Sequence, residues 1–367
     1  MQAGMDNAAG RSFPSGVKRL LIVRLSSMGD IIHTLPAATA LRHTFPGATI
    51  GWIVEERWRE LLCTAQNALS GPRSAQRPLA DRIHVVNTSD WRKAPFSSRT
   101  WVELASGVSD LRGVRYDVAV DFQGAVRSAV LARISNTPVI YGFAQPRENA
   151  SSMWYTRQVL PSGAHIIEQN LSLAAALARR PLGLPKIDFP CDHAVEEKIE
   201  RRLRSHDIRS FAILNPGAGW GAKQWPAERY GFVAKKLADQ GLQSLVNFGP
   251  GEKDLALTAE AAAGGKAEAI SCSLTELIAL TRRARLFVGG DTGPMHLAAA
   301  LSVPVVAIFG PTNPARNGPF GTQSIVLRSK TSPTSHSRRG QPDAGLLEIS
   351  ADAVVTAAHQ LLERTGG

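Results

Sequence analysis

Short apolar runs alternate with amphipathic stretches along most of this chain. The first run, Leu20-Leu21-Ile22-Val23, has the length of a buried strand, and apolar residues at helical spacing follow it from Ile31 to Leu41. Strands that alternate with helices form parallel sheets with right-handed crossovers. The pattern predicts strands over 19–24, 48–54, 82–86, 117–122 and 138–142, and helices over 30–44, 56–63, 100–111, 125–134 and 165–179.

The same alternation starts again after a proline-rich segment. Residues 181–192 contain Pro181, Pro185 and Pro190, which disfavour a helix and predict a linker. We therefore expect an N-terminal Rossmann-like domain over 17–180 and a C-terminal one over 193–348. The second pattern predicts strands over 211–215, 244–248, 286–289, 303–309 and 324–327, helices over 227–240, 252–263 and 274–282, and a C-terminal helix within 349–367.

Composition narrows the class of protein. The chain has 367 residues, 44% of them hydrophobic, which is enough for a sizeable core, and it contains no apolar run of membrane-span length. Residues 1–16 are polar and are expected to be disordered; they lack the apolar core of a signal peptide. The scattered Cys63, Cys191 and Cys272 fit a reducing cytosol and exclude a cysteine-built zinc site.

The charge balance predicts an acidic partner. The chain has 42 basic and 31 acidic residues, which gives a net charge of +11. Nucleic acid, an anionic membrane and a phosphorylated substrate all fit such a charge. The sequence has no aromatic RNA-binding signature, no zinc-finger spacing and no helix-turn-helix pattern, so nucleic acid is not expected.

Candidate chemistry first appears directly after the first predicted strand. Ser26-Ser27-Met28-Gly29-Asp30 is a turn of small residues that ends on a carboxylate. Open α/β sheets bind ligands at the carboxyl edge of their strands. Asp30 is therefore either the N-cap of the next helix or a general base, and the residues alone leave both alternatives open.

A second turn of this kind leads into a helix in the C-terminal half. Gly289-Gly290-Asp291-Thr292-Gly293 supplies glycines for close backbone approach, and the helix start that follows has free N–H groups for a phosphate. His296, about one turn along, faces the same ligand or is merely a satisfied histidine behind a capped helix. Both alternatives stay open.

The glycine-rich loop at 217–224 is not a phosphate-binding P-loop. Ala222 stands where a glycine should precede the lysine, and Gln224 replaces the serine or threonine. What remains is Lys223, a single cation on a flexible loop beyond a strand end. It is either an anion-binding group or an ordinary surface lysine.

Together these motifs resemble the bacterial lipopolysaccharide heptosyltransferases of glycosyltransferase family 9, especially their heptosyltransferase I branch. The resemblance implies the GT-B architecture, in which two Rossmann-like domains face each other across a cleft and the C-terminal helix crosses back to pack on the N-terminal domain. It is carried by residues 26–36, 52–56, 91–93, 116–124, 223–226, 291–293, His296 and 309–312.

The resemblance also implies an activity. It points to an inverting enzyme that moves L-glycero-D-manno-heptose from ADP-heptose to the Kdo residue of Kdo2–lipid A. The partners would be this nucleotide sugar and an anionic glycolipid, reached peripherally at the cytosolic face of the inner membrane. The sequence has no Asp-x-Asp pair, so neither a metal ion nor another cofactor is expected to be obligatory.

The resemblance assigns residues to each step. Asp30 would be the catalytic base, and Lys223 would stabilise the leaving diphosphate. Arg92, Lys93 and Arg147 would contact the acceptor, although the first two also fit a loop of solvated charges. The donor contacts would come from Ser26, Ser27, Gly29, Lys223, Glu252, Cys272, Asp291, Thr292, Gly293 and His296.

Several alternatives remain. Glu252 equally fits a first-turn glutamate that is favoured by the helix dipole. The chain could add heptose at another core position, or it could be a GT-B-shaped nucleotide-sugar-binding protein or hydrolase. A dinucleotide oxidoreductase is not expected, because no G-x-G-x-x-G follows either first strand.

Overall fold

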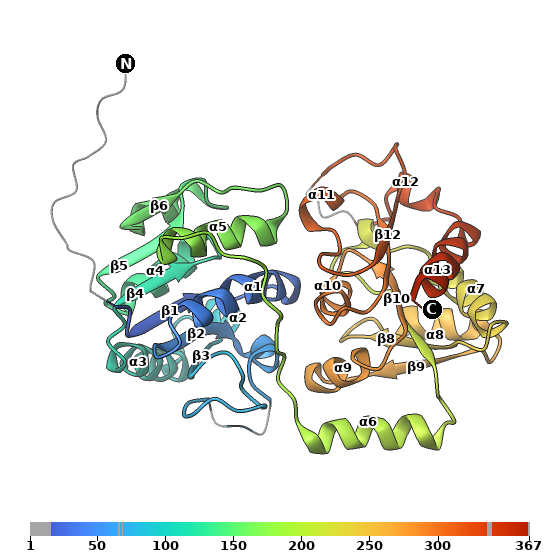
Figure 1. Ribbon diagram of the computed structural model, residues 1–367, viewed down its shortest axis with the longest axis horizontal. Coiled ribbons are helices and arrows are strands. Elements are labelled where there is room, and N and C mark those ends of the chain that lie inside the picture. The colour runs from blue at the N-terminus through green and yellow to red at the C-terminus, as the bar shows by residue number, and fades with distance from the viewer. Residues whose placement is uncertain (1–15, 65–66, 68, 336–339, 366–367) are drawn as a thin grey trace.

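The computed structural model describes residues 16–64, 67, 69–335 and 340–365 (Figure 1). Almost all of the N-terminal segment that was predicted to be disordered, residues 1–15, lies outside the described residues. The rest forms two α/β domains side by side, each built around a six-stranded parallel sheet. The predicted fold class is confirmed.

The first sheet has the strand order β3-β2-β1-β4-β5-β6. Its strands are β1 (Arg19–Val23), β2 (Thr49–Glu55), β3 (Arg82–Val86), β4 (Val118–Asp121), β5 (Val139–Phe143) and β6 (Arg157–Val159). The connecting helices are α1 (Met28–Thr44), η1 (Glu56–Leu61), α2 (Thr88–Lys93), α3 (Ser98–Gly113), α4 (Val126–Ile134), η2 (Asn149–Trp154) and α5 (Ile166–Ala178).

Alternate residues of β1 point to opposite faces of this sheet, and helices cover both. Leu20 and Ile22 are fully buried in a core shared with α1 and α5. Leu21 and Val23 belong to a second core on the other face, which α4 and the end of α3 cover. Burial on both faces explains why the strands read as continuous apolar runs in the sequence.

The second sheet repeats this topology, with the order β12-β11-β10-β7-β8-β9. Its strands are β7 (Phe211–Asn215), β8 (Gln243–Phe248), β9 (Ala267–Ser271), β10 (Leu286–Gly290), β11 (Val305–Phe309) and β12 (Ser324–Arg328). The helices are α6 (His193–Ser205), η3 (Gly221–Lys223), α7 (Ala227–Ala238), α8 (Lys253–Ala263), α9 (Leu274–Thr281), α10 (Gly293–Ala300), α11 (Pro314–Asn317), α12 (Ala344–Leu347) and α13 (Ala351–Thr365).

The C-terminal helix packs on the second domain and not on the first. Val354, Ala358 and Leu361 are fully buried in the core that also holds Leu214 of β7 and Tyr230 of α7. Figure 1 shows α13 beside α7 at the outer side of this domain. The predicted return of this helix to the N-terminal domain is therefore wrong, because its apolar face completes the cover of the second sheet.

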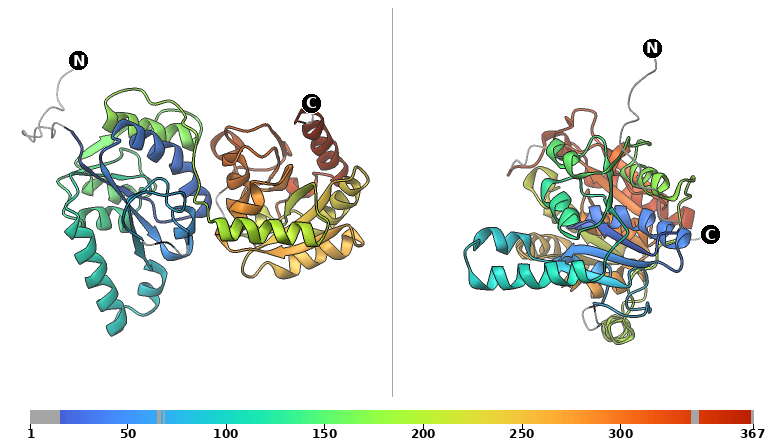
Figure 2. Two further views of the ribbon diagram at one scale, coloured as in Figure 1. Left: turned by 60° about the horizontal axis from the view of Figure 1, so that its bottom comes forward. Right: turned by 90° about the vertical axis from the view of Figure 1, so that its left-hand side faces the viewer.

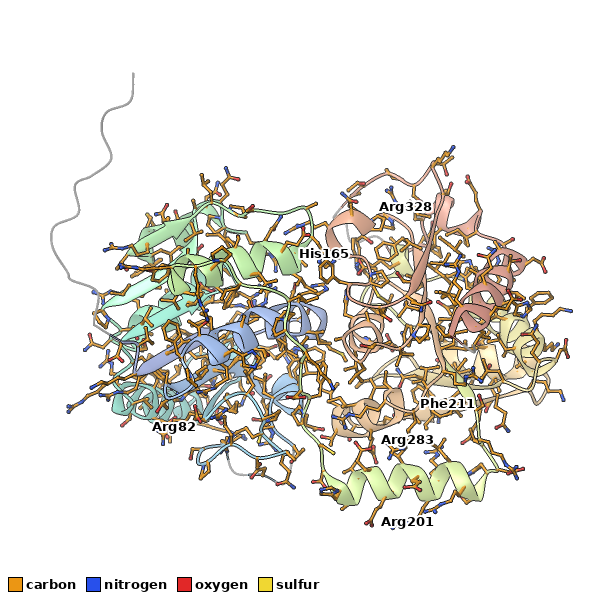
Figure 3. All side chains as sticks on the ribbon, viewed as in Figure 1. Arg82, His165, Arg201, Phe211, Arg283 and Arg328 are labelled. Carbon is orange, nitrogen blue, oxygen red and sulfur yellow. The ribbon has the colours of Figure 1, made fainter. Side chains whose placement is uncertain are left out.

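The two domains share a continuous apolar contact. Leu277 of α9 and Leu297 of α10 belong to the same core cluster as α1 of the first domain. At one side of the contact the Glu60 carboxylate accepts hydrogen bonds from the Thr275 N–H at 2.9 Å and the Thr275 hydroxyl at 2.7 Å. At the other side His165 lies at the domain boundary (Figure 3), where its Nε2 is 3.1 Å from the Gly318 carbonyl oxygen. The domains are therefore in direct contact along these elements.

Strand order determines where a ligand-binding site is expected. In each sheet the strand order reverses between two central strands. These are β1 and β4 in the first sheet and β7 and β10 in the second. Crevices for ligands lie outside the carboxyl ends of the strands at such points. The loops at 24–27, 122–125, 216–224 and 291–292 occupy these four positions.

Candidate active site

Asp30 lies in the first turn of α1, at the carboxyl edge of the first sheet. Ser27 is the N-cap of this helix, and the Asp30 carboxylate accepts hydrogen bonds from the Ser27 N–H and hydroxyl, each at 3.0 Å. The alternative that Asp30 is itself the N-cap is wrong, because Asp30 is the third helical residue and reaches back to the cap. Its side chain is 36% exposed, so a substrate hydroxyl can approach it.

A buried guanidinium, which sequence reasoning missed, keeps Asp30 ionised. Arg24 pairs with the Asp30 carboxylate at 2.7 Å and also donates to the Phe122 carbonyl. Burial alone would raise the pKa of Asp30, but the Arg24 charge, the Ser27 hydrogen bonds and the nearby His296 lower it below its usual value. The sequence held a signal for this role, since Arg24 is a charged residue directly after an apolar strand.

Lys223 and Asp291 form a buried ion pair at the carboxyl edge of the second sheet. The Lys223 ammonium lies 2.6 Å from an Asp291 carboxylate oxygen, and the two side chains are 14% and 6% exposed. Burial alone would raise the pKa of Asp291, but a hydrogen bond from His296 and the Lys223 charge bring it well below its usual range. Asp291 therefore fixes the Lys223 cation next to the start of α10 rather than presenting a free carboxylate to a ligand.

The N-termini of α1 and α10 meet across the domain boundary. Thr292 is the N-cap of α10, and Gly293 is its first residue. A Cβ atom on Gly293 would lie 2.5 Å from the Met28 sulfur, so only glycine permits this approach. The N–H groups at the start of α10, where the helix dipole is positive, therefore face the first turn of α1, which carries Asp30.

Two histidines join the domains behind these helix ends. His296 Nε2 is 3.2 Å from Asp291 Oδ1, and His296 Nδ1 is 3.0 Å from His33 Nε2 of the first domain. A Cβ atom on Gly29 would lie 2.6 Å from the His296 ring, which explains the glycine at this position. Burial and the neighbouring His296 and His165 hold the pKa of His33 well below its usual value. Sequence reasoning quoted His33 in the motif but gave it no role.

Glu252 and Cys272 lie on neighbouring loops of the second domain. Glu252 is the N-cap of α8, and its carboxylate accepts a hydrogen bond from the Gly249 N–H at 2.9 Å. It packs so closely on the loop after β7 that a Cβ atom on Gly217 would lie 2.2 Å from it. Cys272 is half-buried between β9 and α9, and burial raises the pKa of its thiol to about 11, so it stays neutral. Their contacts with a nucleoside remain predictions.

The three predicted acceptor-binding cations all lie on exposed parts of the first domain. Arg92 and Lys93 end α2, and Lys93 lies 3.5 Å from the exposed Asp90. Arg147 is exposed in the loop after β5, and its backbone N–H passes directly over Gly124. All three follow strands of the first sheet, at the edge where Asp30 lies, and their contact with a ligand remains a prediction.

A polar network missed by sequence reasoning connects α2 to the Asp30 loop. Arg127 donates to the Ser26 hydroxyl at 3.0 Å and to the Thr88 hydroxyl at 3.2 Å. Thr88 in turn donates to the buried Glu55 carboxylate, and the Gln123 amide oxygen accepts from the Ser26 N–H at 3.3 Å. Ser26 is therefore hydrogen-bonded within its own domain, and its contact with the donor remains a prediction.

These groups define what the site can do. The first domain contributes a partly exposed, ionised carboxylate, and the second contributes a fixed cation beside a helix N-terminus. A base and an anion-binding site that face each other fit the transfer of a group from a phosphorylated donor to a hydroxyl. In the part of the chain that the structure describes, no group of three or more His, Cys, Asp or Glu side chains is placed to hold a metal ion.

Comparison with known proteins identifies the family. The family model of glycosyltransferase family 9 (heptosyltransferase) matches residues 106–346. The chain belongs to this family. It is 31% identical over 320 residues to lipopolysaccharide heptosyltransferase 1 of Pseudomonas aeruginosa, which covers 85% of this chain and 84% of that protein. The corresponding protein of Escherichia coli K12 is 29% identical over 341 residues, covering 92% and 98%.

Solved structures of family 9 members share this fold. E. coli heptosyltransferase WaaC with ADP has a TM-score of 0.73 at 28% identity, covering 94% of this chain and 99% of that one. The same enzyme with ADP-2-deoxy-2-fluoro heptose has a TM-score of 0.72 at 27% identity. The protein is thus a GT-B glycosyltransferase, and the predicted resemblance is confirmed.

Proposed function

We propose that this family 9 glycosyltransferase moves L-glycero-D-manno-heptose from ADP-heptose to the Kdo residue of Kdo2–lipid A, with inversion. The placement of Asp30 and Lys223 on either side of His296 carries the proposal. Gly29, next to Asp30, packs on the His296 ring, and His296 Nε2 is 3.2 Å from Asp291, the partner of Lys223. Relatives named lipopolysaccharide heptosyltransferase 1 and a relative solved with an ADP-heptose analogue support the donor and the class of acceptor.

In this mechanism Asp30 is the general base. It accepts the proton of the acceptor hydroxyl as that oxygen bonds to the anomeric carbon of the heptose. Arg24 and Ser27 hold the carboxylate in one orientation and keep it ionised before the reaction. A single displacement from the face opposite the departing ADP inverts the anomeric carbon.

Lys223 and the α10 N-terminus stabilise the leaving group. The bond between the anomeric carbon and the phosphate oxygen breaks, and negative charge grows on the diphosphate of ADP. Lys223 is already fixed by Asp291 at 2.6 Å, so its cation needs little rearrangement to meet this charge. These groups supply the cationic function that a divalent ion has in other sugar transferases, and we propose that no metal is obligatory.

The acceptor approaches from the first domain. Arg92, Lys93 and Arg147 are exposed cations near the edge of the sheet that carries Asp30, and they suit carboxylates and phosphates of an anionic glycolipid. We propose that the protein works at the cytosolic face of the inner membrane and binds there peripherally. Among the described residues, no helix has the length and apolar character needed to cross a bilayer.

Mass spectrometry of the reaction products tests the proposal. The protein is incubated with ADP-heptose and a panel of truncated lipopolysaccharide cores, with a parallel reaction that lacks acceptor. We expect addition of one heptose to Kdo2–lipid A, and NMR of the product gives the anomeric configuration. Transfer only to a longer core would assign another core position, and release of free heptose without acceptor would identify a hydrolase.

A further inference from the structure

Three strongly exposed apolar side chains of the first domain lie at one end of α3. Phe96, Trp101 and Val102 are 93%, 61% and 68% exposed, and all three fall within the segment that joins α2 to the first turns of α3. Isolated exposed apolar residues are ordinary on a soluble surface, but a cluster that contains two aromatic rings marks an interaction site. We call these three residues the α3 tip.

We propose that the α3 tip inserts into the headgroup region of an anionic phospholipid bilayer. This inference rests on the proposed function, because a glycolipid acceptor would be presented by a bilayer, and it names the surface that makes the contact. Tryptophan and phenylalanine next to basic residues are typical of segments that lie in a membrane interface.

The packing of α3 leaves this end free. Only Thr100 and Leu111 are buried among the 16 residues of the helix. In both views of Figure 2, α3 (teal) projects from the body of the first domain. A helix of this length normally buries a whole apolar stripe against its own domain. Here Trp101 and Val102 instead lie on the outer side, where a partner would cover them.

The distribution of charge around α3 suits an anionic surface. Residues of an α-helix are about 100° apart around its axis. The arc between Trp101 and Val102 therefore holds Ser98, Ala105, Ser109 and the basic Arg112, and the acidic Glu103 and Asp110 follow beyond Val102. Glu103 is paired with Arg99 at 2.9 Å, and Asp110 lies 2.6 Å from His84. Asp90, exposed in α2, lies 3.5 Å from Lys93, so each of these carboxylates already has a basic partner when the tip approaches negative headgroups.

The position of the tip connects it with the active site. Thr88, the first residue of α2, is hydrogen-bonded through Arg127 to Ser26, directly before the Asp30 loop. Arg92 and Lys93, at the end of α2, stand between this network and the tip along the chain. A bilayer that receives the tip would therefore lie on the acceptor side of the first domain. The chain as a whole carries a net charge of +11, which adds long-range attraction to such a surface.

Binding of the full chain to vesicles tests the proposal without any turnover. Vesicles of phosphatidylethanolamine and phosphatidylglycerol, free of glycolipid, are sedimented with the parent and with Phe96→Ser/Trp101→Ser/Val102→Ser. We expect the triple variant to lose roughly tenfold or more in vesicle affinity, with an unchanged melting temperature. Its kcat on a water-soluble Kdo acceptor without acyl chains should stay at the parental value.

A control variant and a fluorescence measurement identify the surface. Met153→Ser/Leu160→Ser removes two residues that are 78% and 68% exposed and lie beside β6, at the opposite edge of the same sheet from β3. This variant should bind vesicles like the parent. Brominated lipids should quench the fluorescence of the parent more than that of Trp101→Phe, because Trp101 itself enters the bilayer.

Each contrary result has a definite meaning. Equal vesicle binding by the parent and the triple variant would overturn the proposal, as would loss of binding in the β6-edge control. A change in oligomeric state of the triple variant, with vesicle binding intact, would make the tip a protein interface instead. Because the vesicles contain neither acceptor nor donor, absence of heptose transfer would overturn the proposed function and leave the membrane result standing.

Discussion

Replacing Arg24 with Gln tests whether a buried cation controls the ionisation of Asp30. The two side chains pair at 2.7 Å, with Arg24 7% exposed and Asp30 36% exposed. An opposite charge at this range lowers the pKa of a carboxyl group. Because solvent screens a carboxylate with this exposure, we expect the ion pair to contribute about 1 kcal/mol.

The direction of the effect follows from the protonation state that catalysis needs. Arg24→Gln should raise the pKa of Asp30, and only the carboxylate can accept the proton of the acceptor. The acid limb of the kcat/KM profile should therefore move to higher pH, while the alkaline limb stays in place. The assay follows ADP release with a soluble acceptor from about pH 3 to pH 8, because the pKa of Asp30, and with it the parental acid limb, lies below the usual carboxyl range.

Two further variants separate charge from packing. Arg24→Lys keeps a cation beside Asp30 and should hold the acid limb near its parental position. Arg127→Gln removes another guanidinium at the same sheet edge, one that contacts Ser26 and Thr88 instead of Asp30, and it should leave the acid limb unmoved. An acid limb in Arg24→Gln that coincides with the parental one would refute this account of Asp30. An equal displacement in Arg24→Lys would attribute the effect to geometry and not to charge.

Four other outcomes follow from the site. Asp30→Asn should keep donor binding, measured by calorimetry with ADP, and lose roughly 10²–10⁴ in turnover; turnover within a few-fold of the parent would remove Asp30 from the role of base. Lys223→Ala should lower kcat more than donor affinity, and the parent protein should stay active in excess EDTA. If EDTA abolished activity and magnesium restored it, a metal ion and not Lys223 would stabilise the diphosphate. Arg92→Ala/Lys93→Ala should raise the acceptor KM at unchanged donor affinity, and a defect confined to the donor would contradict their position. Because the pKa of His33 is held well below 6.5, folding should lose stability as the pH falls below about 6.5; His33→Asn should flatten that loss in thermal denaturation scans.

Local patterns were enough to predict most of the sheets. The strand β7 was predicted with the bounds that the structure shows. Four apolar residues precede Asn215, where the strand ends, and all five residues are buried. The helix α6 was missed, although Val195, Ile199 and Leu203 recur at helical spacing, because its other residues are mostly charged and it follows a proline-rich segment. The strand β9 was missed because only Ile270 among its residues is buried, which leaves little apolar signal.

Tertiary partners could not be predicted in the same way. The spacing of apolar residues in α13 showed that the helix has an apolar face, but it did not show which domain this face packs on. The prediction placed it on the wrong domain. Lys223 and Asp291 were each selected as site residues, yet their pairing across 68 positions appears only in the folded chain. Arg24 was passed over because its place after an apolar strand marks it as unusual but does not show which carboxylate it pairs with.

The pairing of both charged catalytic groups before any substrate binds has a consequence for the reaction. Asp30 is neutralised by Arg24 and Lys223 by Asp291. In the proposed mechanism the diphosphate of the donor would meet the N–H groups of α10, and Lys223 would be shared between Asp291 and the phosphate. As the bond to the sugar breaks, the growing negative charge competes better with Asp291 for this shared cation. The interaction is then stronger in the transition state than in the bound donor, which is the condition for an ion pair to raise kcat and not only affinity.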